Sequence, residues 1–199
     1  MCYTTLEDVQ ILRERAGVRM IQKDCVILRA MEERDFDLLF RMINSPEIEK
    51  ALGSFTLPVN ENRQREWMKN YRDTREQIRW MIELVNGVTI GVIMLYDIDM
   101  KNGTAEVGYK LMAERENRMP GDIDTALQAV LEYGFLELRL HCIYAHSLSD
   151  NLPSERLLLR NGFQKEGTER QRIYQGGTYV DRNVYSILSE EFLPASSAN

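Results

Sequence analysis

Hydrophobic and polar residues follow two regular patterns between residues 104 and 135. Over residues 105–111, apolar side chains alternate with polar or small ones, and this period of two predicts a strand. Over residues 123–135, apolar side chains recur at every third or fourth position, which predicts a helix with one buried face. Backbone N–H groups at the start of such a helix attract anions, so the loop between the two elements is a candidate phosphate site. The alternative is that no anion binds there, and that Gly121 only makes the turn and Asp122 only caps the helix.

The chain before this region indicates an extension, then two helices and a strand hairpin. The predicted elements are a short helix over residues 4–16, a strand over 25–31, helices over 34–43 and 60–74, and strands over 79–85 and 88–96. Pro46 ends the helix at 34–43, because the residue before a proline is driven out of helical geometry. The pair Asn86-Gly87 between the two strands is the strongest short signal for a hairpin turn. Residues 47–60 predict an irregular or only briefly helical segment.

The chain after residue 135 returns to strands, with one more helix among them. The predicted order is a strand over residues 138–147, a helix over 153–161, a strand near Phe163, and a hairpin that turns at Gly176-Gly177 into a strand over 178–188. A strand placed directly after a helix favours a crossover onto the same sheet. The mixed order indicates a single α/β domain over residues 24–192, preceded by an extension over residues 1–23 and followed by a frayed tail over residues 193–199.

Composition and charge narrow the class of protein. A chain of 199 residues suffices for one domain, and its net charge of -6 argues against a general nucleic-acid binder. No apolar run approaches the roughly 20 residues that span a bilayer, and the first residues lack the pattern of a signal peptide. Cys2, Cys25 and Cys142 are odd in number and widely spaced, which favours reduced thiols and a cytoplasmic location.

Histidine and tryptophan residues indicate no chemistry of their own. His141 and His146 lie an odd number of residues apart on a predicted strand, so they face opposite sides and cannot readily share a metal. We therefore expect no metal site, and neighbouring Cys142 forms no catalytic pair with His141 for the same reason. Trp67 and Trp80 fit the core better than an acceptor groove.

Two motifs near the C-terminus resemble those of one enzyme family. The segment NLPSERLLLRNGFQKEG holds Asn151, Ser154, Gly162-Phe163 and Glu166-Gly167, and it resembles the closing motif of the GNAT N-acetyltransferases. Downstream, GGTYVDRNVYSIL resembles the ending of one branch of that family. This branch includes the acetyltransferases of ribosomal-protein N-termini and many small-molecule acetyltransferases. The order of elements over residues 24–192 also resembles the GNAT order.

The resemblance implies a fold and a cofactor. A GNAT domain is a mixed, mostly antiparallel twisted sheet flanked by helices, and it holds acetyl-CoA in a cleft between two splayed central strands. In this chain, those strands correspond to residues 105–112 and 138–147. The implied cofactor-binding residues are the backbone of Leu111, Met112 and Ala113 for the pantetheine arm, the loop residues Arg118, Gly121, Asp122 and Ile123 for the pyrophosphate, and Asn151 with Ser154.

The resemblance also implies a reaction, the transfer of an acetyl group from acetyl-CoA to a primary amine by direct attack. The amine must lose a proton, and Glu106 is the best-placed carboxylate to accept it, directly or through water. Ser154 is the implied proton donor to the leaving thiolate. Both assignments have structural alternatives: Glu106 fits a surface or ion-paired carboxylate, and Asn151 with Ser154 fits a helix cap.

The candidate phosphate loop departs from the family pattern R/Q-x-x-G-x-G/A. The chain has Arg118-Met119-Pro120-Gly121-Asp122-Ile123, in which Ile123 replaces a small residue and Pro120 removes an N–H donor. Two alternatives therefore stand beside the acetyltransferase. One is a GNAT-fold binding or regulatory module, and the other is a GNAT enzyme with a different acyl donor.

The sequence does not identify the acceptor amine. Asp181, Glu169 and Glu106 favour a cationic amine, so polyamines, aminoglycosides, amino sugars and protein N-termini all fit. The acceptor is expected between the helical region of residues 36–67 and the hairpin of residues 174–181. The sequence indicates a small-molecule amine or a protein N-terminus as partner, no nucleic acid and no membrane, and it is compatible with a homodimer.

Overall fold

The fold is built on one twisted sheet of eight strands. The computed structural model describes residues 20–54, 57–112 and 119–193, and its strands lie in the order β1-β2-β3-β4-β5-β6-β8-β7. Neighbouring strands pair antiparallel except β5 and β6, which pair parallel. The strands are β1 (Ile21–Lys23), β2 (Val26–Arg29), β3 (Ile78–Leu84), β4 (Thr89–Asp99), β5 (Thr104–Leu111), β6 (Cys142–Leu148), β7 (Gln164–Gln175) and β8 (Thr178–Leu188).

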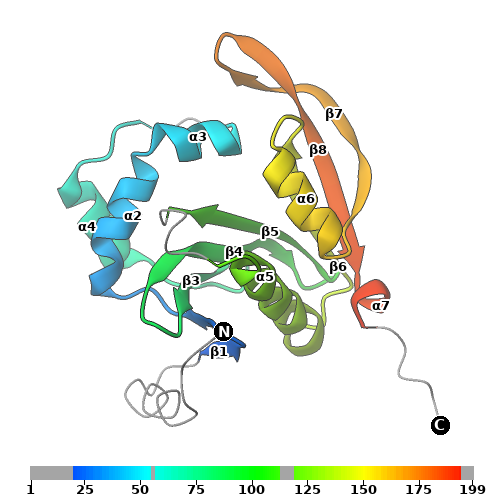
Figure 1. Ribbon diagram of the computed structural model, residues 1–199, viewed down its shortest axis with the longest axis horizontal. Helices are drawn as coiled ribbons and strands as arrows, with labels where there is room; N and C mark the ends of the chain where they lie inside the picture. The colour runs from blue at the N-terminus through cyan, green and yellow to red at the C-terminus, as the bar shows by residue number, and fades with distance from the viewer. Residues whose placement is uncertain (1–19, 55–56, 113–118, 194–199) are drawn as a thin grey trace.

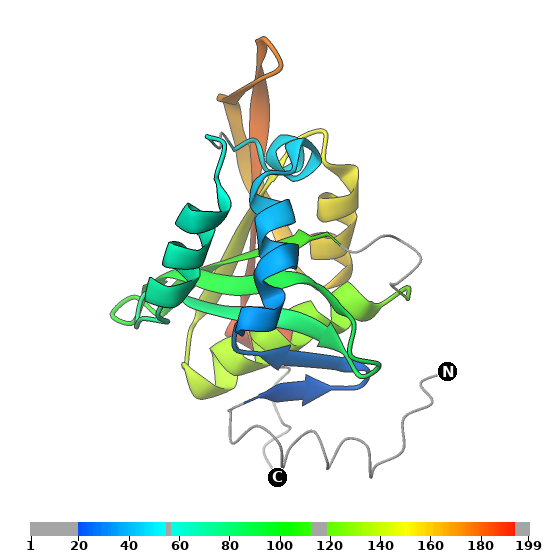
Figure 2. The same cartoon turned by 90° about the vertical axis from the view of Figure 1, so that its left-hand side faces the viewer.

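Helices cover both faces of this sheet. The helices α2 and α4 lie in front of one face in Figure 2, whereas α5 and α6 lie toward the other (Figure 1). The β7–β8 hairpin projects beyond the body of the molecule (Figure 1). The helical elements are η1 (Glu33–Asp35), α2 (Phe36–Ile43), α3 (Pro46–Leu52), α4 (Glu61–Asn70), α5 (Asp122–Glu132), the π-helical turn η3 (Tyr133–Glu137), α6 (Leu152–Arg160) and α7 (Ser189–Phe192).

Short polar side chains fix where three of the helices begin. Ser45 accepts a hydrogen bond from the backbone N–H of Ile48 at the start of α3, and Asn60 accepts one from Arg63 at the start of α4. Asn151 does the same for α6. These side chains satisfy N–H groups that have no partner inside the helix, so each contributes about 1 kcal/mol to local stability.

Alternation along the strands divides the apolar residues between two cores. The larger core lies beneath α5 and α6, where Ile93, Leu95 and Ile143 pack under Leu127 and Leu131. A smaller core lies on the opposite face, where Met81 and Val92 pack under α2. Because successive side chains on a strand point to opposite faces, one strand supplies both cores. The same rule decides which face each site residue occupies.

A buried group of charges fastens α2 to the sheet. The Arg29 guanidinium on β2 pairs with both Asp35 oxygens at 2.7 Å each and with Glu83 of β3 at 2.5 Å. All three residues are buried. Since charges removed from water are costly unless paired, removal of Arg29 leaves the buried Asp35 carboxylate without its cation.

The sheet forks between β5 and β6. The two strands pair only over Thr104, Ala105 and Glu106 of β5 with Cys142, Ile143 and Tyr144 of β6. Beyond Glu106 the two strands form no further ladder, although β5 runs on to Leu111 and β6 to Leu148. The two central strands therefore splay apart beyond Glu106, as expected.

The expected fold class is confirmed, with differences at the ends of elements. The helix predicted over residues 60–74 ends at Asn70, and the strand predicted over 138–147 begins at Cys142, after a π-helical turn. Residues 46–52 form a regular helix, and β1 adds an edge strand that the sequence pattern did not indicate. The predicted helix over residues 4–16 and the tail over residues 194–199 lie outside the described residues.

Two predictions about single residues are wrong. Trp67 was expected in the core, but it is 36% exposed and lines a cavity beside α4, whereas Trp80 is buried as expected. Cys25 was expected to be a reduced thiol, but it is disulfide-bonded in the structure. Cys142 is a free thiol, and burial raises its pKa.

Candidate active site

Glu106 and His146 form a hydrogen-bonded pair at the point where the sheet forks. Glu106 lies at the last position of β5 that pairs with β6, where its partner is Tyr144. His146 lies on β6 two residues beyond Tyr144. Glu106 Oε1 is 2.8 Å from His146 Nδ1. The two side chains are only 12% and 20% exposed. An ionised carboxylate can only accept, so in this pair Nδ1 carries the proton, and the same carboxylate also accepts from the Tyr96 hydroxyl of β4.

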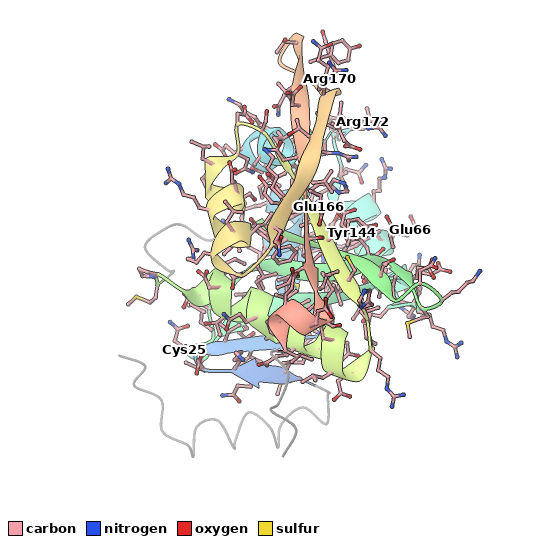
Figure 3. All side chains as sticks on the ribbon, turned by 90° about the vertical axis from the view of Figure 1, so that its right-hand side faces the viewer. Cys25, Glu66, Tyr144, Glu166, Arg170 and Arg172 are labelled. Carbon is pink, nitrogen blue, oxygen red and sulfur yellow. The ribbon has the colours of Figure 1, made fainter. Side chains whose placement is uncertain are left out.

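Two tyrosines enclose this pair. Tyr96 lies opposite Glu106 on β4, and Tyr144 lies opposite it on β6 (labelled in Figure 3). The Tyr144 ring meets the His146 ring edge to face, with 5.7 Å between the ring centres. Burial and the neighbouring Glu106 carboxylate raise the pKa of Tyr96. Both phenols therefore remain neutral donors near Glu106 over the physiological range.

A second pair spans the fork on the opposite face of the sheet. The Tyr109 hydroxyl on β5 lies 2.5 Å from Ser154 Oγ on α6. Burial raises the pKa of Tyr109, although the Ser154 hydroxyl acts in the opposite direction. The phenol thus stays protonated at neutral pH and can pass a hydrogen bond on to the serine.

Asn151 links the start of α6 to the helix α3. Its side-chain oxygen accepts from the Ser154 backbone N–H, and its amide donates to Ala51 O of α3 at 3.1 Å. The capping role left open by the sequence is therefore present for Asn151. Because the cap fixes the first turn of α6, it also fixes where the Ser154 hydroxyl points.

The direction of the backbone N–H and C=O groups decides which residues near the end of β5 can pair with a ligand in the fork. The Met112 N–H donates to Ile90 O at 3.1 Å, on the β4 side. Successive residues of a strand direct their N–H and C=O groups to alternate sides, so the backbone groups of Leu111 point toward the fork. Of the backbone partners expected for a pantetheine arm, Leu111 has the required direction, and Ala113 lies outside the described residues.

The loop before α5 offers an uncapped helix start. Gly121 is the N-cap with φ of 100°, in the left-handed region, and no side chain caps the first turn of α5. Asp122 is buried and its carboxylate accepts from the Met119 N–H at 2.7 Å. A hollow of about 690 Å³ lies over this segment, and Ile123 packs against the main core. Arg118 lies outside the described residues.

Asp124 is neutralised by residues of α6. Arg160 pairs with both of its oxygens at 2.6 and 2.8 Å, and the Asn161 amide donates to it at 2.8 Å. Burial acts to raise the pKa of Asp124, but the hydrogen bonds from Arg160 and Asn161 prevail and lower it. The negative charge that the sequence places beside a candidate phosphate site is therefore already paired.

An apolar cavity of about 570 Å³ lies between the sheet and the helices α2 and α4. Met94 and Val92 of β4 form part of its floor, and Trp67 of α4 forms part of its wall. Three cationic side chains, Arg63 of α4, Arg79 of β3 and Lys110 of β5, also line it. Cross-strand partners share a face, so Lys110 lies on the same face of β5 as Glu106. A further hollow of about 770 Å³ lies beside Trp80 on the other face, away from the Glu106–His146 pair.

The fork brings some expected residues together and leaves others apart. Glu106 and Leu111 lie on β5, and Asn151 and Ser154 lie at the start of α6, whereas Gly121, Asp122 and Ile123 form the separate start of α5. His146 and Tyr109 were not foreseen as site residues. A register for β5 and β6 was needed to find His146, because only the pairing of Glu106 with Tyr144 places it beside the carboxylate.

Comparison with known proteins shows which family this chain belongs to. The family described as an acetyltransferase (GNAT) domain matches residues 26–164. The chain belongs to the GNAT acetyltransferase family. Among GNAT relatives, the uncharacterized N-acetyltransferase YoaA of Bacillus subtilis is 32% identical over 184 residues, which cover 85% of this chain and 96% of YoaA. The ribosomal-protein-serine acetyltransferase of Escherichia coli is 35% identical over 97 residues, 49% of this chain and 53% of that protein.

Solved GNAT structures share the fold. The spermidine N-acetyltransferase of Vibrio cholerae, solved in complex with CoA and spermine, superposes with a TM-score of 0.75 at 24% identity, over 85% of this chain and 99% of that one. The resemblance to GNAT enzymes is thus confirmed, and the protein is an N-acetyltransferase of this family. Within the described part of the chain, no helix is both long and apolar enough to cross a membrane. Among the same residues, no group of His, Cys, Asp and Glu side chains is arranged to hold a metal ion.

Proposed function

We propose that the protein transfers an acetyl group from acetyl-CoA to a primary amine at the fork between β5 and β6. The observation that carries this proposal is the Glu106–His146 pair at the base of the fork, with free strand backbone beyond it. Acetyl-CoA supplies an activated thioester. The protein has to hold that thioester beside the amine, accept a proton from the amine, and return one to the thiolate.

The residues of the fork suit the binding of an acyl-CoA. The backbone of Leu111 faces the gap, where a pantetheine arm can pair with it as a short extra strand. The uncapped start of α5 at Gly121 suits the pyrophosphate, because its N–H groups and helix dipole attract anions. The Asp124–Arg160 pair removes the repulsion that an unpaired Asp124 would exert there. These features favour a working cofactor site over a fold that has lost it.

Glu106 accepts the proton that the amine loses. His146 and Tyr96 hold its carboxylate, which is only 12% exposed, and its remaining lone pairs serve the amine or a bridging water. The amine then attacks the carbonyl carbon, and a Leu111 N–H directed into the fork stabilises the developing negative charge on the carbonyl oxygen. Such donors commonly contribute a large part of the rate enhancement in acyl transfer.

Ser154 returns a proton to the leaving thiolate. Its hydroxyl sits on α6 at the side of the fork away from Glu106, with Tyr109 behind it at 2.5 Å. Tyr109 is kept protonated by burial, so it can replace the proton that Ser154 gives up. Base and acid thus lie on opposite faces of the sheet, with the reacting thioester between them.

The test is product formation by purified protein with acetyl-CoA and a panel of amines. The panel contains spermidine, because a structural relative is a spermidine N-acetyltransferase, together with an aminoglycoside, an amino sugar, aminocarboxylates and a peptide with a free N-terminus. We expect an acetylated amine by mass spectrometry, with one CoA released per product. CoA release without acetylated amine, or no turnover with any member, contradicts the proposal.

A further inference from the structure

The cavity between the sheet, α2 and α4 combines an apolar lining with an unbalanced positive charge. Its lining includes Leu39, Met42, Trp67 and Met94, and its charged members are Arg63, Arg79 and Lys110. Among the described residues, no aspartate or glutamate lines it. An apolar cavity that collects cations without carboxylates is suited to a ligand that carries both apolar surface and negative charge.

Lys110 stands in this cavity without a counter-ion. Within the described part of the chain its ammonium group makes no hydrogen bond or ion pair, although Lys110 is partly buried and charge removed from water is costly unless paired. Burial lowers the pKa of Lys110, and the nearby Arg79 charge lowers it further. Two cations are thus held close together at a cost in stability, which is typical of a binding site rather than of a structural contact.

Arg79 approaches the same cavity from β3 and also lacks full compensation. Its guanidinium lies 5.0 Å from the ring centre of Trp67 and 4.9 Å from that of Tyr71, while Nε is buried with no hydrogen-bond partner among the described residues. Asp73 is the nearby carboxylate, but it accepts from the Tyr71 hydroxyl at 2.8 Å and from the Arg79 backbone N–H at 3.0 Å. The donors of the Arg79 side chain therefore remain available to a ligand.

We infer that this cavity binds an anionic group, a carboxylate or a phosphate, on the acceptor amine, and that Lys110 and Arg79 hold it. The inference rests on the proposed acetyl transfer and specifies its acceptor. It adds an anionic group to the amine acceptor expected from Asp181, Glu169 and Glu106, because Glu169 is paired with Arg182 at 2.5 Å and Asp181 accepts from the backbone of Gln171 at 2.7 Å. The acids of the hairpin are therefore already engaged.

The spacing along β5 relates the cavity to the catalytic pair. Lys110 and Glu106 project from the same face of the strand four residues apart, so their Cα atoms are separated by roughly 13 Å. An elongated acceptor with its anion at Lys110 and its amine at Glu106 spans this distance along the strand. A diamine of the same length would place a second ammonium group against Lys110 and Arg79, where like charges repel.

The experiment compares acceptors of equal length that differ only in the group at the far end. Aminocarboxylates, aminoalkyl phosphates, neutral alkylamines and diamines are titrated calorimetrically into CoA-saturated protein and tested in parallel as acceptors. We expect an anionic member to bind about tenfold tighter than the diamine of its length. The better of the carboxylate and phosphate arms identifies the anion. A diamine that binds as well as or better than both anionic members overturns the inference.

Two variants and a control assign the effect to the cavity. Lys110→Met keeps an unbranched apolar side chain, and we expect it to weaken the anionic ligand about tenfold while the neutral alkylamine changes less than about twofold. Lys110→Arg should retain the preference. The control is Lys101→Met, which removes an exposed charge from the β4–β5 turn outside the cavity. Equal losses in Lys110→Met and Lys101→Met, or no loss in Lys110→Met, contradict the inference.

The two proposals fail in distinguishable ways. Selective binding of the anionic ligands without acetylated product refutes the acetyl transfer and leaves the anion site standing. Acetylation of diamines and neutral amines with no anion preference refutes the anion site and leaves the transfer standing. Arg79→Met gives a second test of the cavity, because Arg79 and Lys110 lie on different strands.

Discussion

Glu106 and His146 meet across the fork of the sheet, with 2.8 Å between the carboxylate oxygen and the imidazole Nδ1. The two residues are forty positions apart in sequence and belong to the two strands that separate just beyond them. This position fixes the carboxylate where β5 and β6 separate, and beyond it the described residues of the two strands form no ladder with each other. A base held there is oriented by the imidazole and sheltered from water by Tyr96 and Tyr144.

Replacement of Glu106 tests its role as the proton acceptor. Glu106→Gln keeps the shape of the side chain and a hydrogen bond to His146, but it removes the basic oxygen. We therefore expect kcat to fall by a factor of about 10²–10⁴. The affinity for acetyl-CoA should stay unchanged, because Glu106 faces the acceptor side of β5. The matched control is Glu166→Gln on β7 (labelled in Figure 3), which should keep nearly full activity. Full activity of Glu106→Gln contradicts the assignment.

His146 is expected to act through Glu106 rather than on the substrate. His146→Leu should lower kcat by about tenfold, and His146→Asn, which keeps an N–H near the Nδ1 position, should restore part of the loss. The double variant with Glu106→Gln should be no slower than Glu106→Gln alone, because effects within one unit are not additive. Equal losses in His146→Leu and Glu106→Gln would instead assign the proton to His146 Nε2.

The buried Arg29 cluster should dominate the stability of the α2 region. Arg29→Ala leaves Asp35 buried without its cation and Glu83 with only the exposed Arg34 at 3.2 Å, so the free energy of unfolding should fall by about 3–5 kcal/mol. The control is Arg34→Ala, whose side chain is 55% exposed and also touches Glu83, and it should cost less than about 1 kcal/mol. Urea unfolding of both variants measures the difference, and similar losses would contradict the role of burial.

The Asp124–Arg160 pair should control the affinity for CoA through charge. Arg160→Ala exposes the unpaired Asp124 carboxylate to the pyrophosphate, so the Kd for CoA should rise about three- to tenfold at low salt. Asp124→Asn added to Arg160→Ala should reverse most of the loss. Screening should shrink the effect at high ionic strength. An affinity in Arg160→Ala equal to wild type contradicts phosphate binding at the start of α5.

Gly121 should be needed for its backbone conformation. Its φ of 100° lies in the left-handed region, and a Cβ there would meet no atom within 4 Å, so Gly121→Ala acts through backbone strain alone. We expect a loss of about 1–2 kcal/mol in stability and weaker CoA binding. The control is Gly167→Ala on β7, where φ is ordinary and a Cβ also meets nothing within 4 Å, and it should change stability by less than about 0.5 kcal/mol.

Lys110 should destabilise the fold at neutral pH. Burial, with a contribution from Arg79, lowers its pKa below the ordinary value of 10.5. Between the folded pKa and 10.5 the unfolded chain binds more protons than the folded one, so wild-type stability rises with pH across that window. Lys110→Met should therefore be more stable than wild type at pH 7, and the gap should close as the pH approaches 10.5.

The comparison of Lys110→Met with wild type isolates the lysine, because the tyrosines that titrate at high pH are common to both proteins. Urea unfolding at several pH values measures the gap. A variant less stable than wild type, or a gap that does not change with pH, would show that Lys110 is compensated in the folded protein. Stability gained together with anionic-ligand affinity lost is the outcome specific to a binding residue.

Local pattern predicted most of the fold. The alternation in β5, the Asn86-Gly87 turn and the caps at Asn60 and Asn151 are each decided by neighbours in sequence. The strand β1 is only three residues long and gains its stability from pairing with β2, so it left little periodic signal. The end of α4 likewise depends on tertiary context, since the chain leaves helical geometry at Tyr71.

The site was less accessible to sequence reasoning. Glu106 and Ser154 followed from a resemblance, but His146 and Tyr109 are defined by contacts across the fork. The exposed Trp67 and the cavity beside Lys110 depend on how α4 lies over the sheet, which no local pattern encodes. His141 lies before β6, and the spacing argument that separated it from His146 did not identify the carboxylate that His146 contacts on a neighbouring strand.

Calorimetric titration of the purified protein with acetyl-CoA, with CoA in parallel, tests the central claim most directly. If the fork and the start of α5 bind the cofactor, acetyl-CoA should bind with low-micromolar affinity at one site per chain. This affinity should be weaker in Gly121→Ala and unchanged in Glu106→Gln. No binding at millimolar acetyl-CoA would contradict the acetyltransferase account and favour a regulatory role or a different acyl donor.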